Sequence, residues 1–310
     1  MIKVDSMIRS FEDMKEMLRA MPLRRTVAVA PAQDMHTLEA VIKAANDGMV
    51  TPVLIGDENE IRAILGELGA SVEELRIIHI EDKTACVQKA VDLVKSGEAD
   101  CIMKGKIETG ELMKVLVNKE TGIRKSSTMS LLAFMESPNY HKVFAITDVG
   151  LLVYPTREQK KAAIENAVEA FHALGIKEPK VAIIAAVEKV NQKMKETVDA
   201  ADIKLEGVPG CIIEGPISYD LAMDPDSAPL KGFESLVAGD ADILVVPDIV
   251  SGNIAAKTIT TIGGGRTGGV VLGAEVPVLL VSRSASADDK YMSIVLAALI
   301  GKSNQAGIIS

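Results

Sequence analysis

Short apolar runs alternate along this chain with longer segments in which apolar residues recur at helical spacing. The short runs are rich in valine, isoleucine and alanine, and most are bounded by polar or turn-forming residues. Such runs predict β-strands, and the longer segments predict amphipathic helices. Strands and helices that alternate at this spacing form βαβ units around a parallel sheet. We therefore predict an α/β fold with mostly parallel strands.

The first half of the chain shows this alternation most clearly. The predicted strands are Thr26–Ala30, Pro52–Gly56, Arg76–Ile80 and Asp100–Met103. The predicted helices are Ser6–Met21, Met35–Asn46, Glu58–Leu68, Thr84–Lys95 and Gly110–Lys119. The polar, turn-rich segment Glu136–His141 follows, and it is the predicted crossing between two domains.

The second half repeats the pattern with longer connections. The predicted strands are Val143–Thr147, Lys180–Ala186, Cys211–Pro216, Asp242–Asp248, Val270–Gly273 and Pro277–Val281. The predicted helices are Arg157–Leu174, Asn191–Ala200, Ser251–Ile262 and Asp288–Leu299. We expect Ser218–Pro229 to be a loop and Gly263–Gly269 to be a flexible turn. The final helix is apolar enough to pack on a formed body, and this composition makes self-association a hypothesis.

The last predicted strand ends in an abrupt change of polarity. Pro277–Val281 is apolar on both faces, which is typical of a strand inside a parallel sheet. Ser282 and Arg283 follow directly, and Asp289 comes shortly afterwards. In open parallel sheets, ligands bind beyond the carboxyl ends of the strands. A permanent cation, a hydroxyl and a carboxylate at that position suit an anionic ligand and a proton transfer.

Composition narrows the class of protein. A chain of 310 residues is long for one domain, which favours two domains that share a cleft. The formal net charge of −9 argues against a general binder of nucleic acid or of anionic membranes. The three cysteines show no metal-ligand spacing, and we interpret them as buried thiols in a reducing compartment. Because neither a signal peptide nor an apolar stretch of ~18 residues is apparent, we expect a soluble, cytoplasmic protein.

Several common motifs fit poorly. Gly263–Gly268 matches GxGxxG, but a predicted helix precedes it and a predicted strand follows, the reverse of the dinucleotide-binding order. The sequence has no Walker A motif and no GxSxG elbow, and its four histidines form no constellation. The acidic residues of Ser218–Pro229 lack the spacing of a calcium loop. We therefore predict no metal site.

Polar residues follow three predicted strands at their carboxyl ends. Each group alone has an ordinary explanation as helix caps and solvated charges. Together they place four cations and a helix N-terminus on one rim, which suits a phosphate-bearing ligand. The groups are Lys104, Gly105 and Lys106; then Asp248, Ser251, Gly252, Asn253 and Lys257; and then Ser282 and Arg283.

Four segments carry a resemblance to a known family. They are MKGKIETGELMKVLVNKETGIR (Met103–Arg124), EGPISYDLAM (Glu214–Met223), GDADILVVPDIVSGNIAAK (Gly239–Lys257) and PVLLVSRSASADDK (Pro277–Lys290). The chain resembles the phosphate acetyl/butyryltransferases, and the butyryl branch more than the acetyl branch. The resemblance implies an enzyme that moves an acyl group between coenzyme A and inorganic phosphate. Coenzyme A would be a substrate, and no cofactor would be bound permanently.

The resemblance also implies a fold and a domain arrangement. The family has two α/β domains with a cleft between them, like isocitrate and isopropylmalate dehydrogenases. Because the final helix returns to the first domain in that fold, we expect residues 1–138 with 284–310 to form one domain and residues 139–283 the other. A homo-oligomer with small-molecule substrates, and without nucleic-acid or membrane partners, is the expected assembly.

The family's catalytic serine, arginine and aspartate correspond to Ser282, Arg283 and Asp289. The resemblance assigns the oxyanion donor to Ser282, the phosphate clamp to Arg283 and the base for the thiol to Asp289. A second family arginine corresponds to Lys114, and three residues remain candidates for its role: Lys114, Arg124 and Lys106.

Two questions remain open at the level of sequence. Ser286 and Asp289 are spaced as a helix capping box, which would explain Asp289 without catalysis. For the function, the alternatives are a phosphate acetyltransferase, a nicotinamide-dependent dehydrogenase of the same fold, and a non-catalytic protein that binds coenzyme A or phosphate.

Overall fold

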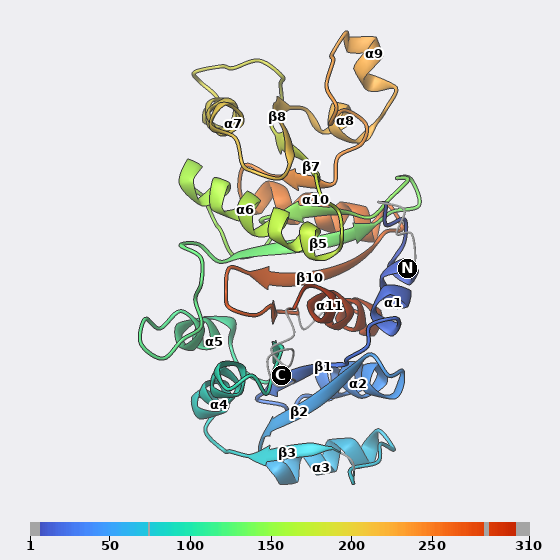
Figure 1. Ribbon diagram of the computed structural model, residues 1–310, viewed down its shortest axis with the longest axis vertical. Coiled ribbons are helices and arrows are strands. Elements are labelled where there is room, and N and C mark those ends of the chain that lie inside the picture. The colour runs from blue at the N-terminus through green and yellow to red at the C-terminus, as the bar shows by residue number, and fades with distance from the viewer. Residues whose placement is uncertain (1–6, 74, 282–284, 302–310) are drawn as a thin grey trace. The chain divides into compact units, whose positions relative to one another are not determined.

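The computed structural model describes residues 7–73, 75–281 and 285–301 (Figure 1). The chain divides into two compact units. The first unit comprises Met1–Phe11 and Thr128–Thr267, and the second comprises Glu12–Ser127 and Gly268–Ser310. Each unit combines helices with a mostly parallel sheet, so the predicted α/β class is confirmed. The domain boundaries expected after residues 138 and 283 stay a prediction.

The sheet of the second unit is mostly parallel. Its strands are β1 (Arg25–Ala30), β2 (Val50–Gly56), β3 (Arg76–His79), β4 (Cys101–Lys104), β10 (Arg266–Leu272) and β11 (Val278–Leu279). They lie in the order β3-β2-β1-β4-β11-β10, and only the pair β10–β11 among these is antiparallel. The strand predicted for Pro277–Val281 is shorter than expected, but it does lie inside the sheet, between β4 and β10.

Helices cover this sheet on both faces. They are α1 (Phe11–Arg19), α2 (Met35–Asn46), α3 (Glu58–Glu67), α4 (Lys83–Lys95), α5 (Thr109–Leu116) and α11 (Ala287–Ile300). The carboxylates of Asp34, Asp57 and Asp82 accept hydrogen bonds from backbone N–H groups in the first turns of α2, α3 and α4. These caps explain why each helix begins directly after an aspartate. Helix α2 packs against α11 and α4 against α5, and the two pairs lie on opposite sides of the sheet in Figure 1.

Helix α11 is enclosed by the second unit. Every residue from Lys290 to Ile300 is buried. A helix that is apolar all round belongs in an interior, so the prediction that it packs on a formed body is confirmed. Its apolar surface is therefore not available for self-association. The hypothesis that the apolar composition of this helix leads to self-association is wrong.

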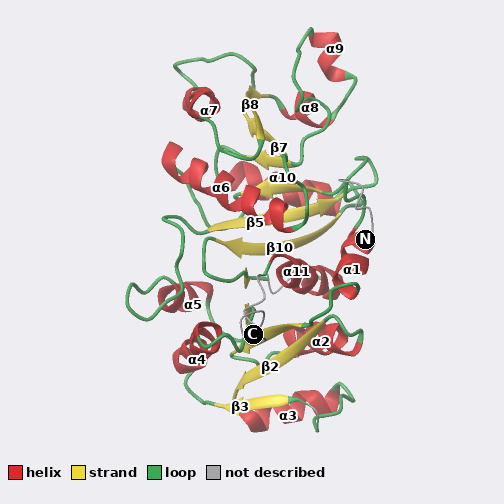
Figure 2. Cartoon of the chain, viewed as in Figure 1, coloured by secondary structure: helices red, strands yellow, loops and turns green. Residues whose placement is uncertain are grey.

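The strands of the first unit are also mostly parallel to one another. Its strands are β5 (Ser130–Glu136), β6 (Phe144–Thr147), β7 (Lys180–Ile184), β8 (Ile212–Ile217) and β9 (Ile243–Val245). They lie in the order β5-β6-β9-β7-β8, and β5 is antiparallel to β6. The helices are α6 (Arg157–Ala173), α7 (Lys195–Glu206), α8 (Tyr219–Met223), α9 (Ser227–Lys231) and α10 (Ile249–Thr261). Figure 2 shows how helices and strands alternate in this unit.

Two expectations about local structure are wrong, and one strand is missing from the prediction. Ser218–Pro229 is not a plain loop, because it contains α8 and the start of α9. Gly263–Gly269 is a turn only at its start, since β10 begins at Arg266. Strand β5 was not predicted at all, although its residues are largely buried. The structure of the described residues contains no helix that is both long and apolar enough to cross a membrane.

Candidate active site

Asp289 lies in the first turn of α11 and is half-buried. Its carboxylate Oδ2 accepts a hydrogen bond from the Ser286 N–H at 3.2 Å. The Ser286 Oγ accepts one from the Asp289 N–H at 3.1 Å. The capping box suggested by the sequence is therefore formed. The other two predicted catalytic residues, Ser282 and Arg283, lie outside the described residues.

A pocket of about 530 Å³ lies in the second unit, where β1, β4 and β11 end. In open parallel sheets this is the edge at which ligands bind. The pocket is lined by residues from four segments of the unit: Asp34, His36, Thr37, Lys104, Gly105, Lys106, Val281 and Lys290. Two of the predicted phosphate-binding residues, Lys104 and Lys106, are thus brought together in one hollow.

Gly105 allows two backbone segments to meet at this pocket. A Cβ on this residue would lie 1.9 Å from the carbonyl oxygen of Pro31, far inside van der Waals contact. The neighbouring N–H of Lys106 donates to the same Pro31 oxygen at 2.9 Å. The segment after β4 is therefore held against the segment after β1, and no residue larger than glycine fits.

The two lysines differ in their surroundings. Lys104 is half-buried, and its ammonium group donates to the Gly105 carbonyl at 3.3 Å. Lys106 is exposed and forms an ion pair with Glu60 at 3.1 Å. Exposed pairs of this kind are weak because water screens them, so an incoming anion can compete with Glu60 for Lys106.

Lys290 is a residue of this pocket that the sequence argument did not assign to the site. It follows Asp289 in α11, is 4% exposed and lines the pocket. A signal was available: Lys290 directly precedes the mostly apolar segment Tyr291–Ile300, which is typical of a buried helix. The pattern of apolar residues does not show which elements pack around this helix, and these elements decide what Lys290 faces.

Asp34 supplies the negative charge in this pocket. Burial opposes its ionisation, but hydrogen bonds from the Thr37 hydroxyl and N–H and the nearby charge of Lys290 hold the pKa of this carboxyl below its ordinary value. Its Oδ1 accepts from the Thr37 N–H at 2.9 Å and from the Thr37 hydroxyl at 2.6 Å. Asp34 is therefore both the N-cap of α2 and an ionised neighbour of Lys290.

Lys114 and Arg124 are not among the described residues that line the pocket. Lys114 is exposed in the last turn of α5, where a cation stabilises the helix C-terminus. Arg124 is also exposed, and its backbone forms an isolated antiparallel bridge with Ala274. Among the three candidates for the second family arginine, Lys106 alone lies in this pocket within the described ranges.

The remaining predicted site residues lie at the start of α10 in the first unit. The Asp248 carboxylate accepts from the Ser251 N–H at 2.9 Å and caps the helix. A Cβ on Gly252 would lie 2.8 Å from the Asp148 carbonyl oxygen, so glycine allows α10 to approach the end of β6 closely. Asn253 donates to the Val149 carbonyl at 3.4 Å. Lys257, two turns into the helix, is exposed.

Asp148 organises the segment after β6, and the sequence argument missed it. It is 5% exposed, and its carboxylate accepts from the backbone N–H groups of Leu131, Gly150 and Leu151 at 2.6, 2.7 and 2.7 Å. Three such bonds satisfy the oxygens of a buried carboxyl group. The segment after β6 is thereby fixed to the start of β5.

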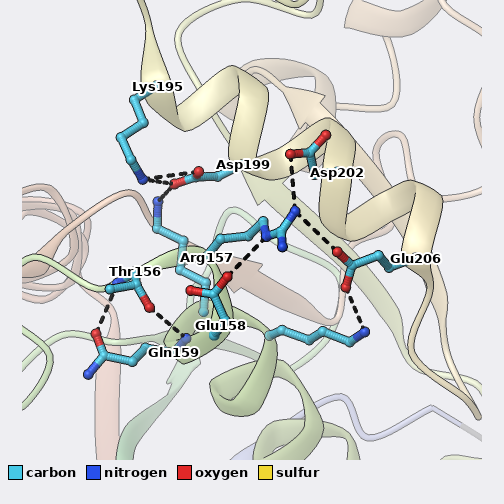
Figure 3. A network of polar contacts seen from close by, with 10 residues as sticks. Thr156, Arg157, Glu158, Gln159, Lys195, Asp199, Asp202 and Glu206 are labelled. Carbon is cyan, nitrogen blue, oxygen red and sulfur yellow. Dashed lines mark hydrogen bonds and ion pairs between the residues drawn. The ribbon is translucent and has the colours of Figure 1, made fainter.

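A separate polar network joins α6 to α7 in the first unit (Figure 3). Arg157 bridges Asp202 and Glu206, and the buried Lys160 pairs with Asp199 at 3.0 Å. Thr156 and Gln159 form the capping box that starts α6. These contacts hold two helices together, and they account for the charges of this region without a ligand.

Comparison with known proteins agrees with the resemblance. The family model described as Phosphate acetyl/butaryl transferase matches residues 12–92 and 83–298. A phosphate butyryltransferase of Clostridium acetobutylicum is 38% identical over 298 residues, 95% of this chain and 99% of that protein. A phosphate acetyltransferase of Thermotoga maritima is 39% identical over 279 residues, 89% of this chain and 95% of that protein.

A solved structure supports the same assignment. The crystal structure of a branched-chain phosphotransacylase from Enterococcus faecalis matches with a TM-score of 0.81 at 32% identity, over 89% of this chain and 98% of that one. Fold and comparisons define an acyltransferase of the phosphotransacylase class. The chain belongs to the phosphate acetyl/butyryl transferase family.

Proposed function

We propose that the protein transfers a short-chain acyl group, with butyryl favoured, between coenzyme A and inorganic phosphate. The observation that carries this proposal is the 38% identity to a phosphate butyryltransferase over 95% of the chain. The lysine-lined pocket at the carboxyl ends of β1 and β4 supports it, because ammonium groups bind phosphoryl oxygens.

The transfer occurs directly in a ternary complex. The thiolate of coenzyme A attacks the carbonyl carbon of the acyl phosphate, and a C–S bond forms as the C–O bond to phosphate breaks. A thiol with a pKa of roughly 8.5 is mostly protonated near neutrality, so a base is needed. A donor for the tetrahedral oxyanion and a cation for the leaving phosphate complete the requirements.

Named residues fill these roles. Asp289 removes the thiol proton, Ser282 donates to the oxyanion and Arg283 binds the phosphate. Lys104 and Lys106 are proposed as further phosphate-binding residues, and Lys106 as the counterpart of the second family arginine, because both line the pocket. Asp248, Gly252, Asn253 and Lys257 remain proposed substrate-binding residues, although caps and close packing account for three of them.

The test is a panel of acyl phosphates with two to five carbons, compared by kcat/KM with coenzyme A as acceptor and without added metal or nicotinamide. We expect the maximum at butyryl phosphate. Absence of thioester formation with the whole panel would contradict the proposal.

A phosphate acetyltransferase is the second candidate, favoured by the 39% identity to the Thermotoga maritima protein. A methylene in an apolar pocket discriminates by only about 1–3 kcal/mol. The two activities will therefore overlap, and the acyl panel separates them by the position of the maximum.

We also propose that the protein self-associates through α10. Ala255, Ala256 and Ile259 of this helix pack on the core of the first unit. The opposite side of the helix exposes Val250 and Ile254, at 51% and 60%, and Ile262, which follows the helix, is 83% exposed. Lys257 is the one charged residue within α10, so a second copy can approach this side with little charge repulsion.

The proposal also covers the location of the protein and its other partners. The three free thiols Cys86, Cys101 and Cys211 support a reducing, cytoplasmic compartment. A metal-independent reaction without nucleic-acid or membrane partners remains part of the proposal. Cell fractionation and activity in the presence of a chelator test these statements.

A further inference from the structure

Lys290 is a buried cation at a ligand pocket, and its chemistry is not used by the mechanism above. Its side chain lines the pocket, although the residue is 4% exposed. Removing an ammonium group from water is costly, and an apolar residue of similar length is often equally stable in such a place. A purely structural lysine is therefore a poor explanation for this position.

Among the described residues, the neighbours of Lys290 compensate its charge only in part. The ammonium group donates to the Ala285 carbonyl at 3.3 Å. The ionised Asp34 acts on it electrostatically, but Asp34 Oδ1 is committed to two hydrogen bonds from Thr37. An ammonium group has three N–H donors, so a pocket ligand with several acceptor oxygens can complete its environment.

The charges of the pocket point to the class of ligand. The described residues of its lining include three lysines, Lys104, Lys106 and Lys290, and one carboxylate, Asp34. Glu60 offsets Lys106 from outside the pocket lining. This excess of positive charge occurs in a chain whose net charge is −9. A phosphoryl group, with its negative charge and three oxygens, fits such a lining.

We propose that Lys290 binds a phosphoryl oxygen of a substrate in this pocket, together with Lys104. The proposal rests on the proposed function, since it deepens the site of the phosphate acyltransferase. Lys290 then orients the phosphoryl group from inside α11, one residue after Asp289. Base and phosphoryl contact share the first turn of one helix, which fixes their separation.

Two substrates carry such a group: inorganic or acyl phosphate, and coenzyme A with its own phosphates. Kinetics distinguish them. Lys290→Met keeps the length and apolar stem of the side chain and removes the charge. If the ligand is the transferred phosphate, the KM for phosphate with butyryl-CoA should rise about 10-fold or more, and the KM for coenzyme A should stay within about 3-fold. If the ligand is a phosphate of coenzyme A, the KM for coenzyme A should rise about 10-fold or more, and the KM for phosphate should stay within about 3-fold.

Lys290→Arg should recover part of the lost affinity, because it restores the positive charge. If Lys290 had only a structural role, Lys290→Met would not change one KM selectively. Lys160→Met is the matched control, because Lys160 is also buried and pairs with Asp199. It should lower thermal stability and leave both KM values unchanged. If Lys290→Met does not fold, Lys290→Gln replaces it in the same assays.

Binding of inorganic phosphate, measured by calorimetry on the full chain, keeps this test independent of turnover. The wild-type protein could bind phosphate without catalysing the transfer, and Lys290→Met could weaken this binding at least 10-fold. That result would contradict the proposed function and support the role of Lys290 in phosphate binding. An active wild-type protein whose two KM values and phosphate binding are unaffected by Lys290→Met overturns the role given to Lys290.

Discussion

Ser286 and Asp289 exchange hydrogen bonds across the first turn of α11, with the Ser286 N–H donating to Asp289 Oδ2 at 3.2 Å and the Asp289 N–H donating to Ser286 Oγ at 3.1 Å. The residue proposed as the catalytic base is thus also half of a helix cap. Each role predicts a different outcome for substitution, so the two can be separated.

Asp289→Asn keeps an oxygen that can accept the Ser286 N–H bond but cannot act as a base. We expect kcat to fall about 100-fold or more with little change in melting temperature, because a general base contributes on that scale. Ser286→Ala is the control: it removes a cap worth about 1 kcal/mol and should leave kcat within a few-fold. Near-normal turnover by Asp289→Asn would mean that Asp289 is a cap alone.

Arg283→Ala should raise the KM for phosphate about 10-fold or more, because the proposed charged contact to the phosphate is lost. The melting temperature should change little. The comparison is Arg266→Ala, since Arg266 is exposed and paired with Glu136. That variant should lose up to about 1 kcal/mol of stability and keep normal kinetics. Unchanged phosphate kinetics in Arg283→Ala would remove the phosphate clamp from the mechanism.

Gly105→Ala should distort the pocket, because the added Cβ would lie 1.9 Å from the Pro31 carbonyl oxygen. We expect a loss of about 1–3 kcal/mol in the free energy of unfolding and weaker phosphate binding. Gly110→Ala, in α5, meets no heavy atom within 4 Å and should stabilise the protein by about 0.5–1 kcal/mol. Chemical denaturation measures both, and equal effects would show that the close approach at Gly105 is unimportant.

Ile254→Glu should shift the protein to smaller assemblies, since it places a charge on the exposed side of α10. Size-exclusion chromatography with light scattering measures the change. Leu205→Glu is the control, because Leu205 is 88% exposed on α7, away from that helix. A monomeric wild-type protein, or an Ile254→Glu variant with the wild-type mass, contradicts self-association through α10.

Acid should weaken the first unit at Asp240. Burial opposes ionisation of this carboxyl, but hydrogen bonds from Lys142, Lys180 and His141 lower its pKa from 3.8 to about 2. Because the folded-state pKa is the lower one, the stabilisation is complete above about pH 4. It is lost as the pH falls from there towards 2.

Asp240→Asn tests this expectation. Urea unfolding of the wild type and the variant at pH 6, 4, 3 and 2 should give stabilities that converge as the pH falls. The buried Lys142 also pairs with Asp242 at 2.6 Å, so the variant keeps a partner for this lysine. A difference between the two proteins that is constant from pH 6 to pH 2 would mean that Asp240 is not the group that titrates.

The pattern of apolar residues predicted most strands and helices, because strand and helix periods are local properties of the sequence. It missed β5 (Ser130–Glu136), which pairs antiparallel with β6 and follows no βα repeat. It also placed Ser218–Pro229 in a loop, where the short helices α8 and α9 occur. These two helices have five residues each, too few for a helical period to be recognised.

The sequence by itself determined the α/β class, the helix caps and the family, because each depends on residues that are near one another in the chain or on their order. Only the tertiary structure decided that Lys104, Lys106 and Lys290 line one pocket with Asp34, since these residues follow different elements of the second unit. It likewise decided that α11 is enclosed and that α10 exposes Val250 and Ile254. Which residues a side chain faces depends on strand order and helix packing, and neither is encoded in a local period.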